Sequence, residues 1–161
     1  MLAFAEWLQA SPLGHFMRES GPWTYAIVNL AHVLGIATLF GSILVLDLRL
    51  VGVGRRVPLA ALSSAVVPVA ATGFVIAAMT GVGLLATKTT EYLGNPFLFI
   101  KFPAIALGLI NAGLVRRTGA WQAHQQRELT ANEERQLAML GGVSLLCWLT
   151  AITAGRMIAY W

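Results

Sequence analysis

Three ionisable side chains lie inside long apolar segments of this sequence: His32, Lys101 and Arg156. Placing a charge in hydrocarbon is costly, so such residues mark functional-site candidates when they face the interior of a bundle. At a helical rise of 1.5 Å per residue, they lie about 10, 7 and 6 Å from the nearest ends of their segments. We therefore expect them to form one polar layer near one face of a membrane.

Two further side chains belong to this layer. Met79 lies about 10 Å from the end of its segment, and Asn29 shares a helix face with His32 through i, i+3 spacing. A neutral imidazole is an axial ligand for haem iron, and a thioether can be the sixth ligand. The layer predicts a haem b site with His32 and Met79 as metal ligands. Lys101 and Arg156 would face the propionates.

The second axial position has several candidates. His15 lies in the N-terminal segment and can reach the site only if that segment folds over the bundle. His124 lies between the third and fourth apolar segments and therefore on the opposite side of the membrane. The iron is therefore expected to be five-coordinate or to take its sixth ligand from Met79, His15 or Lys101.

Copper is the competing cofactor, because Cu(I) accepts imidazole and thioether ligands. His32, Met79 and Met157 all fall in the same half of the membrane, but no Met-x-x-Met motif and no second cysteine beside Cys147 accompanies them. Purely structural roles are the other interpretation. Lysine and arginine near a boundary can extend to the headgroups, and a buried imidazole can bond a neighbouring backbone carbonyl.

The composition indicates a membrane protein. Apolar residues make up 57% of the chain and charged residues 11%, with a mean hydropathy of +0.71, far from the balance of soluble domains. Four apolar segments are long enough to cross about 30 Å of hydrocarbon. They span residues 26–46, 59–86, 97–115 and 137–158. We expect one all-α domain over residues 1–161, a bundle of four transmembrane helices.

Loop arginines predict the orientation of this bundle. Seven follow the first and third segments: Arg49, Arg55, Arg56, Arg116, Arg117, Arg127 and Arg135. Only Arg18 and Lys88 lie opposite. Because basic residues in short loops resist translocation, we expect both basic loops in the cytoplasm and both termini outside. An outer aromatic belt would comprise Trp23, Tyr25, Tyr92, Tyr160 and Trp161.

Local signals predict where helices begin. Asn95 followed by Pro96 is typical of an N-cap, and Thr130 with Glu133 three residues later of a capping box. Residues 3–20 have helical apolar spacing, with a restart at Ser11, but are too short and polar to span. We expect them to form an interfacial amphipathic helix, either an anchor or a lid. They lack the pattern of a cleavable signal peptide.

Other chemistry has little support in the residues. No nucleotide-binding glycine loop, no His-Glu-x-x-His motif and no carboxylate in the polar layer is present, so whether the chain is an enzyme stays open. The net charge of +4 comes largely from the loop arginines, which topology explains, and we expect no nucleic-acid partner. Asp47 and Arg49 are interpreted as a boundary ion pair.

Around His32 the sequence reads N-L-A-H-V-L-G-I-A-T-L-F-G-S, followed by L-D-L-R-L. Over nearly its whole length it resembles uncharacterised bacterial four-helix membrane proteins. Lys101 in F-L-F-I-K-F-P-A-I-A-L-G adds a distant similarity to the copper-resistance D-type and haem-binding membrane protoporphyrinogen oxidase families. That resemblance implies that His32 is the haem ligand and Lys101 its accompanying lysine. The additional metal ligands of the copper-resistance family are absent.

These observations lead to one functional expectation. The chain is expected to be a haem b-binding protein of the bacterial inner membrane that handles electrons near its periplasmic face, with a quinone or a periplasmic redox protein as partner. The sequence has no second in-helix histidine of a di-haem cytochrome. A copper or small-solute transporter, and a structural subunit of a membrane complex or oligomer, are the alternatives.

Overall fold

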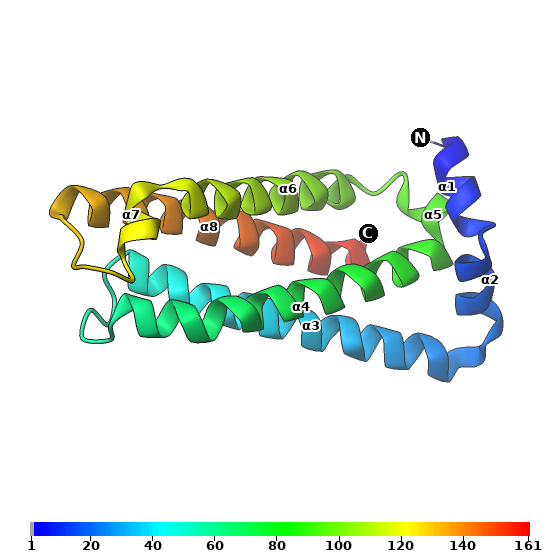
Figure 1. The fold of residues 1–161 in the computed structure, drawn as a ribbon. Helices are drawn as coiled ribbons and strands as arrows, with labels where there is room; N and C mark the ends of the chain where they lie inside the picture. The colour runs from blue at the N-terminus through cyan, green and yellow to red at the C-terminus, as the bar shows by residue number, and fades with distance from the viewer. Residues whose placement is uncertain (1) are drawn as a thin grey trace.

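The computed structural model describes residues 2–161, and every regular element in that range is a helix (Figure 1). The elements are α1 (Leu2–Gln9), α2 (Pro12–Glu19), α3 (Gly21–Leu50), α4 (Leu59–Thr87), α5 (Thr89–Tyr92), α6 (Pro96–Arg117), α7 (Gly119–Ala123), α8 (Ala131–Met157) and the 3-10 turn η1 (Ile158–Tyr160). Four of them, α3, α4, α6 and α8, are long and apolar enough to cross a membrane. The structure thus has the predicted number of helices that could span a membrane, which indicates a multi-pass membrane protein.

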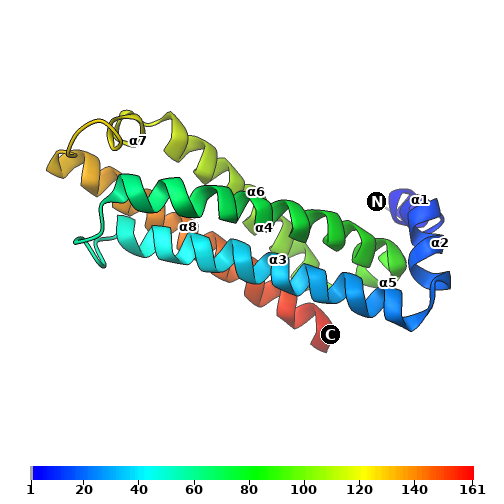
Figure 2. The same ribbon diagram turned by 60° about the horizontal axis from the view of Figure 1, so that its bottom comes forward.

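The bundle consists of two helix pairs. α3 packs along α4, α6 packs along α8, and α8 also contacts α3 (Figures 1 and 2). Close backbone approach holds the first pair, since a Cβ added at Gly73 would lie 2.5 Å from Leu39 N and 2.9 Å from Gly35 O. Helices in lipid lack a hydrophobic driving force for association. Small residues at such crossings let the backbones approach closely, so that van der Waals packing stabilises the pair.

The second pair uses the small-residue stripe of α6. Ala104, Gly108 and Asn111 are buried, and a Cβ at Gly108 would lie 3.1 Å from the Trp148 ring. The Asn111 amide donates to the Leu140 carbonyl at 3.0 Å. These residues therefore form an interhelical face against α8.

The N-terminal helices run across one end of the bundle, here called the terminal end and made of α1, α2, α5 and η1 (Figure 1). Ser11 breaks the segment as predicted, because its hydroxyl accepts from Gly14 N and caps α2. Gln9 Oε1 accepts bonds from the backbone N–H and hydroxyl of Thr90 at 3.0 and 2.8 Å, and Met17 lies against Gly83 of α4. α1 and α2 are thus fastened to α4 and α5.

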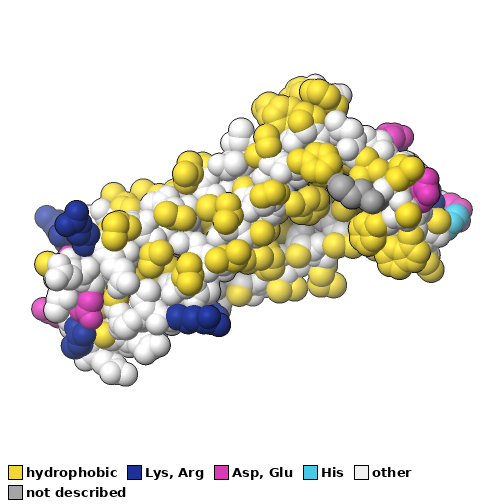
Figure 3. Space-filling model, turned by 90° about the horizontal axis from the view of Figure 1, so that it is seen from above, with side chains coloured by type: hydrophobic (Ala, Val, Ile, Leu, Met, Phe, Trp, Pro, Cys, Tyr) yellow, Lys and Arg dark blue, Asp and Glu magenta, His cyan; other side chains and the backbone are white. Residues whose placement is uncertain are grey.

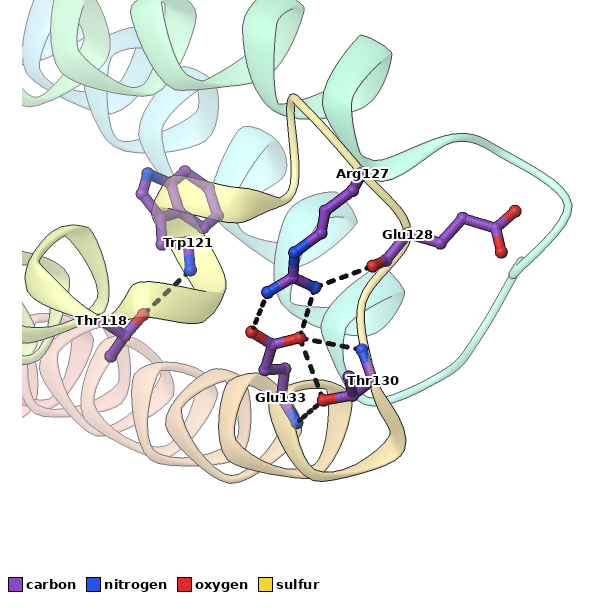
Figure 4. A network of polar contacts seen from close by, with 6 residues as sticks. All are labelled: Thr118, Trp121, Arg127, Glu128, Thr130 and Glu133. Carbon is purple, nitrogen blue, oxygen red and sulfur yellow. Dashed lines mark hydrogen bonds and ion pairs between the residues drawn. The ribbon is translucent and has the colours of Figure 1, made fainter.

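Two predicted helix starts are confirmed. Asn95 Oδ1 accepts from Phe97 N at 3.0 Å and caps α6. Thr130 and Glu133 form a capping box at the start of α8. Glu133 also receives two hydrogen bonds from the Arg127 guanidinium, at 2.7 and 2.9 Å (Figure 4). This contact fastens the loop before α8 to its first turn.

The opposite end carries the loop 51–58, α7 and the loop 124–130, and is called the basic end. In Figure 3 most of the visible Lys and Arg side chains lie toward this end, the left end in Figure 1. His124, predicted to lie on the side of the membrane opposite the polar layer, is found at this end; it is 7% exposed and its Nε2 lies 2.8 Å from the Ser63 hydroxyl. The carbonyl of Trp121 accepts from Nδ1, so Nε2 accepts from Ser63 and ties α7 to α4.

Removing that tie is expected to destabilise the basic end. Ser63→Ala leaves Nε2 of the buried His124 ring without a hydrogen-bond donor, which costs about 1–3 kcal/mol. The neighbouring Ser64 is exposed and bonds only the Ala61 carbonyl of its own helix. Thermal unfolding in detergent should therefore show a lower midpoint for Ser63→Ala and little change for Ser64→Ala. Equal midpoints would contradict the buried tie.

Candidate functional site

His32 is the central residue of the candidate site. It projects from α3 onto α4, where its Nδ1 lies 2.9 Å from the Ala77 carbonyl oxygen and 3.1 Å from Thr80 Oγ1. A Cβ added at Gly81 would lie 3.0 Å from the imidazole Cε1. The ring therefore fits against α4 at a place where α4 has no side chain.

These contacts determine the tautomer of His32. A carbonyl oxygen can only accept, so Nδ1 carries the proton and donates it to Ala77 O. Thr80 donates its own hydroxyl proton to the Ile76 carbonyl at 2.6 Å, which leaves its oxygen free to accept as well. The unprotonated Nε2 then has a free lone pair. Metal-bound histidines show this arrangement, in which the second nitrogen donates to a backbone carbonyl.

Lys101 belongs to the same region of the bundle. Its ammonium on α6 packs against α8, where a Cβ added at Gly155 would lie 3.4 Å from Nζ. Lys101 is half-buried. No hydrogen bond or ion pair to it occurs among residues 2–161. It is therefore a half-buried cation available to an anionic group.

Arg156 points to a different place. Its Nη2 donates to the Tyr160 hydroxyl at 2.7 Å, and its guanidinium lies 5.0 Å from the centre of the Tyr160 ring. The side chain is exposed. This geometry agrees with the structural interpretation, a cation that extends to the membrane boundary beside an aromatic residue.

The remaining predicted site residues do not join His32. Met79 is 71% exposed, and it lies two residues after Ala77, about 200° around the helix from it. Asn29 is exposed. His15 is exposed on α2 and pairs with Glu19 at 3.3 Å. His32 and Lys101 thus each pack against a neighbouring helix, His32 on α4 and Lys101 on α8, whereas the other four are exposed.

Without Met79 the donor set contains one good metal ligand. Within residues 2–161 no group of three or more His, Cys, Asp or Glu side chains is arranged to hold a metal ion. Cu(I) is held by several soft ligands, whereas haem iron is held in the plane by the porphyrin and needs one axial imidazole from the protein. His32 and Lys101 therefore fit haem better than copper.

Asp47 is a polar residue of the bundle that sequence reasoning misplaced. The expected boundary ion pair with Arg49 is wrong: Arg49 Nε donates to the Val57 carbonyl at 2.7 Å, and Asp47 is 4% exposed with no partner at Oδ2. Ser144 is buried on α8, one turn after Gly141, where an added Cβ would lie 3.4 Å from the Asp47 backbone oxygen. Asp47 is buried because it continues the buried face of Leu39 and Leu50, a spacing that was readable in the sequence.

Comparison with known proteins identifies the family but not its activity. A search of characterised proteins and a search of solved structures each gave no match. A model of a protein family matches residues 4–161, almost the whole chain. The resemblance to an uncharacterised family is therefore confirmed, while no link to the copper-resistance or haem-binding families is shown. The chain belongs to DUF6644, a family of unknown function.

Proposed function

We propose that this protein is a haem b-binding membrane protein that handles electrons near the terminal end of its bundle. One observation carries the proposal: the Nδ1–H of His32 is held by the Ala77 carbonyl, which leaves Nε2 as a ligand. His32 would hold the iron, and Lys101 would attract a propionate. When bound, the haem would supply a one-electron redox couple.

The proposed orientation follows from the loop arginines. The basic end lies in the cytoplasm, and the terminal end lies at the outer face of a bacterial inner membrane. α1 and α2 rest in the outer interface, where their exposed aromatic residues, Phe4, Trp7 and Phe16, contact headgroups. A quinone or a periplasmic redox protein would exchange electrons at this end.

The residues around His32 perform two tasks in this proposal. Ala77 and Thr80 fix the ring orientation and keep Nε2 unprotonated, which raises the basicity of the ligand. Lys101 supplies a positive charge that favours a dianionic cofactor over a neutral one. Gly81 leaves the space that the imidazole occupies.

A visible spectrum tests the proposal. The full chain is expressed in cells supplied with a haem precursor and purified in detergent. We expect a Soret band, with α and β bands that sharpen on reduction by dithionite. His32→Asn keeps a side-chain amide able to bond the Ala77 carbonyl but has no counterpart of Nε2. It is therefore expected to keep the fold and lose the band, whereas His15→Asn keeps both.

The outcomes separate binding from folding. Thermal unfolding of His32→Asn near that of the unloaded wild-type protein shows that the bundle is intact, and added imidazole should restore the band in His32→Gly. A wild-type protein without a Soret band, or a band that survives in His32→Asn, overturns the proposal. Copper analysis of the same samples tests the competing cofactor.

Lys101 gives a second expected effect. Lys101→Met removes an unpaired cation from a membrane segment, where the cost of such a charge reaches about 2.5–3.5 kcal/mol at the helix centre. The protein without haem should unfold at a higher temperature, and haem should be retained less well during purification. Unchanged haem retention would show that Lys101 does not face a propionate.

A further inference from the structure

A cavity of about 670 Å³ lies at the basic end between the loop 51–58 and the loop 124–130. Leu50, Leu59 and Leu129, which pack on or within the core cluster at this end, line its apolar part. Leu50 ends α3 and Leu59 begins α4. The cavity therefore lies where two spanning helices end, at the membrane boundary.

The charge of the cavity is positive. Four arginines, Arg49, Arg55, Arg56 and Arg127, line it, against the two acidic residues Glu128 and Glu134. Arg127 is engaged by Glu133, and Arg55 faces Glu134 at 3.9 Å, which is a weak contact between exposed groups. For Arg56, no hydrogen bond or ion pair occurs among residues 2–161. Arg55 and Arg56 are therefore the guanidinium groups available to a ligand.

Side-chain contacts hold both walls of the cavity in place. Arg49 bonds the carbonyls of Val57 and Arg55, at 2.7 and 3.4 Å, and so fixes the loop 51–58. The other wall is fixed by the capping box at Thr130 and the Arg127–Glu133 pair (Figure 4). The buried contact between His124 and Ser63 connects this wall to α4. The site is thus formed before any ligand arrives.

We propose that this cavity binds the phosphate group of an anionic phospholipid. A guanidinium presents a planar fork of N–H donors that matches phosphate oxygens. The apolar wall at the ends of α3 and α4 suits the glycerol and upper acyl region of a lipid better than a free polar anion. Basic pockets between spanning helices at the cytoplasmic side of a membrane bind anionic lipid headgroups in other membrane proteins. The inference is independent of haem binding.

Thermal unfolding in detergent micelles tests the lipid site. Dioleoyl phosphatidylglycerol, dioleoyl phosphatidylcholine and inorganic phosphate are added separately to the purified full chain. We expect phosphatidylglycerol alone to raise the unfolding midpoint. In Arg55→Gln/Arg56→Gln its affinity should fall about fivefold for each arginine removed. Both positions are exposed in a loop, so the variant should fold.

The matched control is Arg116→Gln/Arg117→Gln, which removes two arginines of the last turn of α6 that are outside the cavity lining. It should keep the response to phosphatidylglycerol. Equal loss in both double variants would reduce the effect to net charge and overturn the proposal. The proposal would also be overturned if inorganic phosphate but not phosphatidylglycerol raised the unfolding midpoint. The same holds if phosphatidylcholine raised it as much as phosphatidylglycerol.

Discussion

Gly73→Ala is expected to lower the stability of the bundle by about 1–3 kcal/mol or more, the cost of overpacking a filled interior. The added methyl would stand 2.5 Å from Leu39 N and 2.9 Å from Gly35 O, both backbone atoms that cannot rotate away. α3 and α4 would have to separate along their contact. Thermal unfolding in detergent measures the effect.

Gly41→Ala is the matched control, on the partner helix of the same pair. A Cβ there meets nothing within 4 Å, and alanine favours a helix over glycine by about 0.8–1 kcal/mol. The two glycine-to-alanine changes should therefore shift the unfolding midpoint in opposite directions. If both raise it, the close approach of α3 and α4 is contradicted.

The separation of α3 from α4 has a consequence at the candidate site. Gly35 follows His32 by three residues and so lies on the same face of α3. The same crossing that Gly73 permits also brings Nδ1 of His32 to the Ala77 carbonyl, 2.9 Å away. Gly73→Ala should thus weaken haem retention as well as stability, whereas Gly41→Ala should leave the Soret band unchanged.

The helices were predictable because a segment in lipid must satisfy its own backbone. A charge-free apolar stretch of about 20 residues has no alternative to a helix. The helix starts were equally local: Asn95 and Thr130 bond backbone groups two and three residues away. Such signals need no knowledge of the rest of the chain.

The composition of the site was less predictable, because depth along a helix does not specify direction around it. Met79 was placed at the right depth by counting residues, but two residues turn a side chain by about 200° from Ala77, and it is exposed. Arg156 was likewise at the right level, yet its partner is Tyr160, four residues further along the chain in η1. His32 and Lys101 remain because both face other helices.

The cavity at the basic end could not be read from the sequence at all. Arg55 and Arg127 are 72 positions apart, and each belongs to a run of loop cations that orientation alone would explain. They line one space because α3 packs on α4 and α8 contacts α3. The buried His124 escaped prediction for the same reason, since its partner Ser63 lies on another helix.

Asp47→Asn is expected to stabilise the bundle by about 1–3 kcal/mol. The carboxyl is 4% exposed and its Oδ2 has no partner, so its ionised form is a buried charge without compensation. An amide of nearly the same shape removes the charge and keeps one oxygen acceptor. A higher unfolding midpoint in detergent is the expected result.

Ser144→Ala is the companion change and should have the opposite sign. It removes a buried hydroxyl on the face of α8 that packs against α3 near Asp47, and the loss of a polar neighbour of a buried carboxyl should lower the midpoint. If both variants lower the unfolding midpoint, a partner group in the membrane compensates for burying the Asp47 carboxylate. If they diverge as expected, the chain retains a carboxyl that costs stability, and in a membrane protein such a group is a candidate for a functional role.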